Sequence, residues 1–187
     1  PDLFNRDNTP TGYLSQKYIH PRLEITSTGS NNGGQLEAHR PVIRLAELYL
    51  SLAEAQAMVS QHLGTNYKTQ ALNNLNEIRD GAGIPKLTLS DSEQDPMKWI
   101  RQERFAEFFQ EGQRYYDVRR WKLGEEKFGG PYYGLNAISK KDPTFSEFNQ
   151  RVEILGQNIK FSKRLYLMPL FHNEVYKNPQ LIQAPGY

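Results

Sequence analysis

Apolar residues recur at helical spacing through the segment 41–61. Leu45, Leu48 and Leu52 lie three and four residues apart, so they share one face of a helix. Small side chains of the same segment form a second apolar face, made of Ala46, Ala53 and Ala57. A helix that is apolar on two sides is typical of the interior of a helical fold. We therefore expect both faces of this helix to be buried between neighbours.

Two more helices are predicted, over 69–80 and 96–111, and a shorter helical piece follows the second of them. Only residues 62–67 separate the first helix from the next, a length that favours an antiparallel helical hairpin. Gly81 suits a left-handed position after the last turn. Asp95 is a good N-cap for the third helix, because its carboxylate can accept from a free backbone N–H.

The remaining segments lack helical periodicity. Residues 1–40 form an irregular lead-in, 41–123 the helical core, 124–160 an irregular insertion and 161–187 a C-terminal tail. Within the insertion, "RVEIL" and "NIKF" alternate around Gly156 and predict a small hairpin. The predicted fold class is mainly α, with helical hairpins, long irregular loops and little β-structure.

Composition and charge exclude several classes of protein. Among 187 residues, Lys plus Arg number 23 and Asp plus Glu 21, so the charges nearly balance. The sequence has no basic stripe of the kind that indicates a nucleic-acid partner. The chain has no cysteine, so disulfides and thiolate metal sites are excluded. No apolar run reaches the roughly 18 residues of a membrane span. The chain begins at Pro1 without a signal peptide, and we expect it to be a processed or truncated piece.

Motifs for metals, nucleophiles and cofactors are missing from the sequence. The histidines stand far apart, with none three or four residues from another: His20, His39, His62 and His172. There is no HExxH, GxSxG, GxGxxG or P-loop. The acidic run "DSEQD" (91–95) lacks the glycine and distal glutamate of a calcium loop, and helix capping explains it better. We predict no metal and no cofactor.

The stretch "IRQERFAEFFQEGQRYYDVRRW" (100–121) carries the densest charge in the chain. Glu103, Glu107 and Glu111 form a stripe that could supply the two carboxyls of a glycosidase. Interleaved arginines stand at offsets that allow ion pairs, and pairing with arginine lowers a carboxyl pKa, opposite to what a general acid needs. An anion site at Arg119 and Arg120 is an alternative. We predict a structural ion network and no catalytic residue; its members are Arg104, Glu107, Glu111, Arg114, Asp117 and Arg120.

Within this network, the spacing predicts particular partners. Arg104 can reach Glu107 or Glu111, Glu111 can reach Arg114, and Asp117 can reach Arg120. Because the aromatic neighbours must face a core, we expect Arg104 and Glu111 to be largely buried and paired.

Four segments together resemble the SusD/RagB family of bacterial outer-membrane nutrient-binding lipoproteins. They are "PVIRLAELYLSLAEA" (41–55), "ALNNLNEIRDGAGIP" (71–85), the charged stretch 100–121 and "LYLMPLFHNEVYKNPQLIQAPGY" (165–187). Their order and the ending at Tyr187 make the combination specific. The chain departs from the family pattern at Asp80, Phe171 and Ala184.

The resemblance implies a TPR-like fold in which the charged stretch is structural. It also implies that the chain is the C-terminal part of a longer surface-exposed lipoprotein, held to the outer membrane by an N-terminal lipid anchor missing from these residues. The implied role is non-catalytic capture of an oligosaccharide or other nutrient for a TonB-dependent, SusC-like transporter. The alternatives are a TPR-like protein–protein interaction module and, more remotely, a glycoside hydrolase.

Candidate ligand-binding residues lie in "GGPYYGLN" (129–136). Tyr132 and Tyr133 could offer flat faces to sugar rings, and the amide of Asn136 could bind hydroxyls. In the alternative interpretation one tyrosine packs inward and nothing binds there, or the family's ligand site lies outside this chain. The near-zero net charge favours a neutral oligosaccharide over a polyanion.

Overall fold

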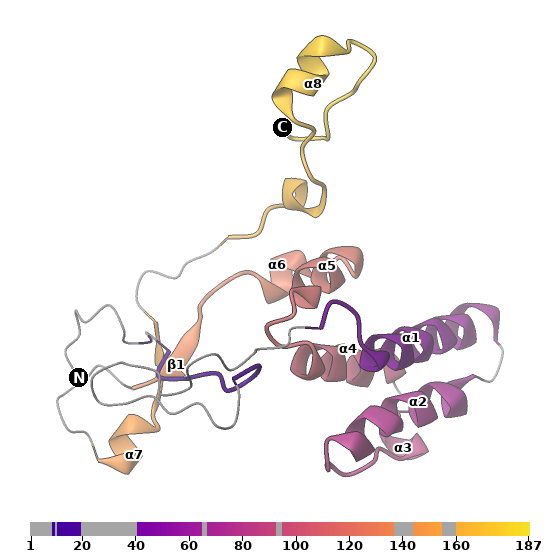
Figure 1. Ribbon diagram of the computed structural model, residues 1–187, viewed down its shortest axis with the longest axis vertical. Helices are drawn as coiled ribbons and strands as arrows, with labels where there is room; N and C mark the ends of the chain where they lie inside the picture. Colours follow the sequence, from indigo (N-terminus) through magenta and orange to yellow (C-terminus); the bar gives the residue numbers. More distant parts are fainter. Residues whose placement is uncertain are drawn as a thin grey trace. The chain divides into compact units, whose positions relative to one another are not determined.

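The structure is a computed structural model, and it describes residue 9 and residues 11–19, 41–64, 67–92, 95–136, 144–154 and 160–187. The chain forms two compact units, Lys17–Arg114 and Pro1–Gln16 with Tyr115–Tyr187. The described residues are mainly helical with a small two-stranded sheet (Figure 1), which confirms the predicted fold class. No helix among them is long and apolar enough to span a membrane.

The elements fall in the following order along the chain. The α-helices are α1 (Leu45–Leu63), α2 (Lys68–Gly81), α3 (Leu89–Ser92), α4 (Pro96–Glu107), α5 (Gln113–Arg120), α6 (Gly124–Lys127), α7 (Phe145–Phe148) and α8 (His172–Lys177); the strands are β1 (Tyr133–Leu135) and β2 (Arg151–Glu153), and η1 (Lys163–Tyr166) is a 3₁₀ helix.

The core of the unit Lys17–Arg114 lies among α1, α2 and α4, which Figure 1 shows packed together. Leu50 of α1, Leu75 of α2 and Ile100 of α4 are almost completely buried. Alanines line the contacts between them, at positions 46, 53 and 57 of α1 and 71 of α2. Small side chains let helix axes approach closely, so the larger residues of all three helices meet in one cluster.

The leucine face of α1 departs from the prediction. Leu45, Leu48 and Leu52 are 64%, 61% and 49% exposed, so the expectation that they are core residues is wrong for this chain. The alanine face, together with Leu50, packs on α2 and α4 instead. Because the helix turns only one side toward these two neighbours, its opposite side faces outward.

Helix boundaries differ from the predicted ones by a few residues. The first helix begins at Leu45, because Arg44 is extended (φ −140°, ψ 159°). Gly81 lies inside the last turn of α2, and Gly83 takes the left-handed conformation with φ of +69°. The Asp95 carboxylate accepts from the Lys98 backbone N–H at 3.2 Å, which confirms the predicted N-cap. The fourth helix ends at Glu107, and the chain turns through Gly112 (φ +81°) before α5.

The β1–β2 hairpin belongs to the other unit. Its antiparallel register pairs Tyr133 with Glu153, Gly134 with Val152 and Leu135 with Arg151. The predicted hairpin of "RVEIL" with "NIKF" falls largely on residues 155–159, which lie outside the described ranges, so it stays a prediction. A Cβ at Gly134 would lie 2.8 Å from the Thr11 carbonyl oxygen, and Thr11 also accepts from the Leu135 N–H at 2.9 Å. The absent side chain thus allows residue 11 to lie against this face of the hairpin.

The same unit packs α6 against residues 161–166. The Phe161 ring occupies the space beside Gly124, where an added Cβ would overlap the ring. The Gly124 N–H donates to the Tyr166 hydroxyl at 2.8 Å, and Tyr166 in turn donates to Glu125. Phe161 and Tyr166 stack edge to face with centroids 4.8 Å apart. Because glycine at position 124 has no side chain, Phe161 and Tyr166 can lie directly against α6.

Candidate functional site

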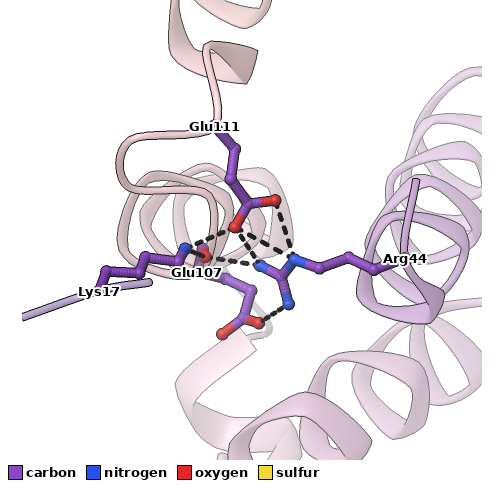
Figure 2. Close-up of polar contacts among 4 residues, drawn as sticks. All are labelled: Lys17, Arg44, Glu107 and Glu111. Carbon is purple, nitrogen blue, oxygen red and sulfur yellow. Dashed lines mark hydrogen bonds and ion pairs between the residues drawn. The ribbon is translucent and has the colours of Figure 1, made fainter. Parts of the chain in front are cut away.

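Four charged side chains, Lys17, Arg44, Glu107 and Glu111, form a cluster that we call the ionic cluster (Figure 2). The backbone at Arg44 is extended, and its guanidinium points toward the C-terminal end of α4. Arg44 Nε and Nη2 each donate to a Glu111 carboxylate oxygen at 2.8 Å, and Nη1 donates to Glu107. Lys17 Nζ donates to the Glu107 carbonyl at 2.7 Å and also to Glu111. The cluster thus joins three segments that are distant in the sequence.

These contacts set the charge of Glu111. Its side chain is only 11% exposed, and burial by itself would raise the carboxyl pKa. Hydrogen bonds from Arg44 and Lys17 outweigh burial and lower the pKa to about 2. Burial would likewise lower the pKa of Arg44, but its two carboxylate partners raise it above the usual value. Glu111 is therefore ionised throughout the physiological range, as a fixed partner for cations rather than a proton donor.

The other acidic residue of the stripe is buried and paired as well. Glu103 Oε2 accepts from Arg79 Nη1 at 2.8 Å, and this arginine also donates to the Pro85 carbonyl at 2.8 Å. Arg104 lies 4.0 Å from the buried Glu54 of α1. Each of these pairs joins α4 to another helix, so the charges of the stripe tie the helices of the unit together.

The predicted network is confirmed for some of its members and differs from the structure for others. Arg104 is buried and Asp117 pairs with Arg120 at 2.9 Å, as the spacing predicts. For Glu107 and Glu111, however, the structure shows Arg44 as the partner, from outside the stretch. Arg114 stacks on Phe105, 4.6 Å from the ring centroid. Helical offsets within a stretch carry no information about a partner on another helix, so charge spacing alone could not identify Arg44 or Arg79.

The residues proposed to bind ligand differ from one another in their surroundings. Tyr132 is half-buried and donates its hydroxyl to the Phe128 carbonyl at 3.1 Å. Tyr133 is 45% exposed, and the Arg151 guanidinium lies 3.9 Å from its ring centroid. Asn136 is half-buried, and its backbone N–H donates to Phe148 at 3.0 Å. A platform of two open tyrosine rings is therefore not what the structure shows, and Tyr133 is the accessible ring.

The exposed face of the β1–β2 hairpin brings Tyr133 together with two residues that sequence reasoning missed. Side chains of alternate strand residues share a face, so the register places Tyr133, Arg151 and Glu153 on one side. Apart from the stacking of Arg151, neither Arg151 nor Glu153 makes a side-chain hydrogen bond or ion pair within the part of the chain that the structure describes. Alternation in "RVE" indicates that 151 and 153 share a face, but only the register shows that Tyr133 lies there too.

We call Tyr133, Arg151 and Glu153 the hairpin face. It offers an aromatic ring, guanidinium N–H donors and a carboxylate acceptor, which are the groups that recognise hydroxyl-rich ligands. Among the described residues, by contrast, no group of three or more His, Cys, Asp or Glu could hold a metal ion.

Comparisons with known proteins define the class to which this helical, ion-paired architecture belongs. The model of the SusD family matches residues 1–187. The chain therefore belongs to the SusD family.

Individual relatives agree with this assignment. The chain is 32% identical over 179 residues to SusD-like protein P2 of Formosa agariphila, covering 93% of this chain and 31% of that protein. The solved structure of BT4246 is 45% identical and has a TM-score of 0.82, covering 100% of this chain and 30% of its own. A SusD-like protein from Bacteroides fragilis is 35% identical with a TM-score of 0.60, over 78% of this chain and 25% of its own. The chain thus spans about a third or less of these relatives.

Proposed function

We propose that the chain takes part in non-catalytic binding of an oligosaccharide at the bacterial cell surface, for delivery to a TonB-dependent, SusC-like transporter. Membership of the SusD family supports binding of glycans for uptake. The same membership supports, as parts of this proposal, the SusC-like transporter as the partner and the outer membrane as the location. Attachment to the membrane would be through an N-terminal lipid anchor outside residues 1–187.

The observation that carries ligand binding by these residues is the exposed hairpin face. The part of the Tyr133 ring that the Arg151 guanidinium leaves open can stack on the C–H groups of a sugar, while Arg151 donates and Glu153 accepts hydrogen bonds. One cation and one anion on the same face cancel, so the face gives no net attraction for a polyanion. A neutral oligosaccharide fits this combination better than a sulfated or carboxylated one.

The acidic stripe supports a non-catalytic role. A glycosidase needs one carboxyl held protonated and a second held near it across the sugar. In this chain Glu103 pairs with Arg79, and Glu107 and Glu111 share Arg44. Arg44 binds both carboxylate oxygens of Glu111 and helps to lower its pKa to about 2, so Glu111 does not hold the proton that glycoside cleavage requires.

Binding and hydrolysis can be tested together on the purified chain. A glycan array screened with neutral, carboxylated and sulfated oligosaccharides identifies a ligand, and calorimetry with that ligand measures affinity. Chromatography of the same sugar after prolonged incubation measures cleavage. We expect binding of a neutral oligosaccharide without shorter products. Sugar release that disappears in the Glu103→Gln or Glu107→Gln variant would contradict the proposal.

A further inference from the structure

The register of the β1–β2 hairpin places Glu153 next to Tyr133. The Ile154 N–H donates to the Tyr132 carbonyl at 2.9 Å, which makes residues 132 and 154 a hydrogen-bonded pair. Tyr133 and Glu153 therefore form the adjacent pair, the kind without backbone hydrogen bonds between its two members. In such pairs the side chains are closest, with Cβ atoms roughly 4.5–5.5 Å apart. The Glu153 side chain thus stands beside the tyrosine side chain on the hairpin face.

The two charged residues of the hairpin face differ in what they contact. The Arg151 guanidinium lies 3.9 Å from the Tyr133 ring centroid, so this cation is engaged with the ring. Glu153 is exposed and makes no hydrogen bond or ion pair within the part of the chain that the structure describes. A carboxylate has two oxygens and only accepts hydrogen bonds. A ligand that engages Glu153 must therefore supply donors.

The chemistry of sugars decides which donors reach this carboxylate. A sugar that stacks its C–H groups on an aromatic ring carries its hydroxyls around the rim of its own ring, where a neighbouring side chain meets them. Two hydroxyls on adjacent carbon atoms, a vicinal diol, provide two donors side by side. The two oxygens of a carboxylate form a matching fork, and its charge-assisted hydrogen bonds are stronger than neutral ones. A vicinal diol therefore fits Glu153 better than a single hydroxyl does.

We propose that Glu153 determines which sugars the hairpin face binds, by accepting hydrogen bonds from a vicinal diol of the sugar that stacks on Tyr133. This inference rests on the proposed function and names its substrate class: oligosaccharides whose sugars keep two free hydroxyls on adjacent carbons. A sugar with an acetamido group at one of these carbons, or with a linkage through one of the two oxygens, lacks the second hydroxyl. Such sugars should bind the hairpin face more weakly.

A positively charged amino sugar is the other donor that could occupy Glu153. An ammonium group has three donors and would pair with the carboxylate. The Arg151 guanidinium, however, lies on the same face and against the same ring. A second cation there costs electrostatic energy, because like charges repel. A neutral diol meets no such repulsion, so the charges of the hairpin face favour the diol.

Hexasaccharides that differ in their free hydroxyls test this proposal by calorimetry on the 187-residue chain. Maltohexaose, cellohexaose and mannohexaose keep a vicinal diol in every sugar. Laminarihexaose and chitohexaose have none in their internal sugars, and the hexamer of glucosamine carries ammonium groups. Each hexamer is titrated into the parent, Glu153→Gln and Glu77→Gln. Glu77 is exposed on α2 and is the matched control.

We expect at least one of the hexamers with internal diols to bind about tenfold or more tightly than laminarihexaose and chitohexaose. Glu153→Gln should lose this preference, because glutamine keeps the size of the side chain but replaces one acceptor oxygen by a donor. Glu77→Gln should bind like the parent. The melting temperature should be the same in all three proteins, since Glu153 makes no hydrogen bond or ion pair among the described residues.

Other results would overturn the proposal. An unchanged preference in Glu153→Gln, or equal affinity for hexamers with and without internal diols, would show that Glu153 does not select the sugar, while the proposed binding of oligosaccharides stands. Tightest binding of the glucosamine hexamer would show that the carboxylate takes a cation instead. If no hexamer with a diol binds, the substrate class is wrong, and the proposed function fails with it only when the glycan array finds no ligand either.

Discussion

Arg44 and Glu111 show at the scale of single residues how the charged stretch stabilises the fold. The guanidinium of Arg44 reaches two carboxylates of the α4 segment and also lies 5.1 Å from the centroid of the Phe108 ring. Arg104 lies 5.0 Å from the same ring. The two guanidinium groups therefore cover the Phe108 ring as well as pairing with carboxylates. Removing one of these arginines would uncover part of the ring and leave its carboxylate partners with one donor fewer.

Removing Arg44 should destabilise the fold. In Arg44→Ala, Glu107 and Glu111 lose a shared charged donor, and we expect the free energy of unfolding to fall by about 1–3 kcal/mol. Chemical denaturation measures the change. Lys86→Ala is the matched control. Both side chains of the ion pair between Lys86 and Asp80 are exposed, so this pair should contribute less than about 0.5 kcal/mol. Equal effects of the two substitutions would contradict the role given to Arg44.

Acid should remove part of the stability through Glu111. Its folded pKa of about 2 lies below the ordinary value of 4.5, so the folded state holds the proton less tightly than the unfolded state. The contribution is complete above pH 4.5 and is lost as the pH falls from 4.5 toward 2. A shift of this size corresponds to up to about 3 kcal/mol. Unfolding free energies measured from pH 7 to pH 2 should fall less steeply in Glu111→Gln, and parallel curves would show that the residue contributes nothing.

At the scale of elements, the two apolar faces of α1 have different energetic roles. Leu75 of α2 is 2% exposed, and Leu48 of α1 is 61% exposed. We expect Leu75→Ala to lower the free energy of unfolding by about 2–5 kcal/mol. Leu48→Ala in the 187-residue chain should change it by less than about 0.5 kcal/mol. Denaturation of the two variants side by side tests the assignment, which a large loss at Leu48 would refute.

The contact between α6 and Phe161 makes a second prediction at this scale. A methyl group at position 124 would overlap the Phe161 ring, so Gly124→Ala should lower the free energy of unfolding by about 1–3 kcal/mol. At Gly81, in the last turn of α2, an added Cβ meets nothing within 4 Å. Gly81→Ala should therefore be neutral or slightly stabilising. Thermal melts compare the pair, and a Gly124→Ala variant as stable as the parent would show that the tail does not pack there.

Periodicity and capping account for what could be predicted about these elements. The helices around Leu50, Leu75 and Ile100 were predictable because apolar spacing and the Asp95 cap are local signals. The choice between the two faces of α1 was not, since both are apolar and only the packing partners decide which of them is buried. The same limit applies to Arg44 and to the strand partner of Arg151, whose contacts join segments that are far apart in the sequence.

At the scale of the whole molecule, the chain spans about a third or less of the length of the relatives that it matches. It belongs to the SusD family and covers 30% of BT4246. Its described residues supply a helical unit joined by charged pairs and, in the second unit, a hairpin that carries the one accessible tyrosine of the predicted pair. Residues 129–136 were predictable as a candidate site from their glycines and tyrosines. Arg151 and Glu153 were not, because they come from another strand.

The central claim is that the hairpin face binds an oligosaccharide, and calorimetry on Tyr133→Ala tests it most directly. The titrant is the neutral oligosaccharide that the array identifies, and Tyr176→Ala is the control, since Tyr176 is 85% exposed on α8. Loss of a stacking ring should weaken binding by about tenfold or more, the equivalent of roughly 1.4 kcal/mol, with the melting temperature unchanged. Tyr176→Ala should bind like the parent. Full affinity in Tyr133→Ala would contradict the claim and place the ligand elsewhere.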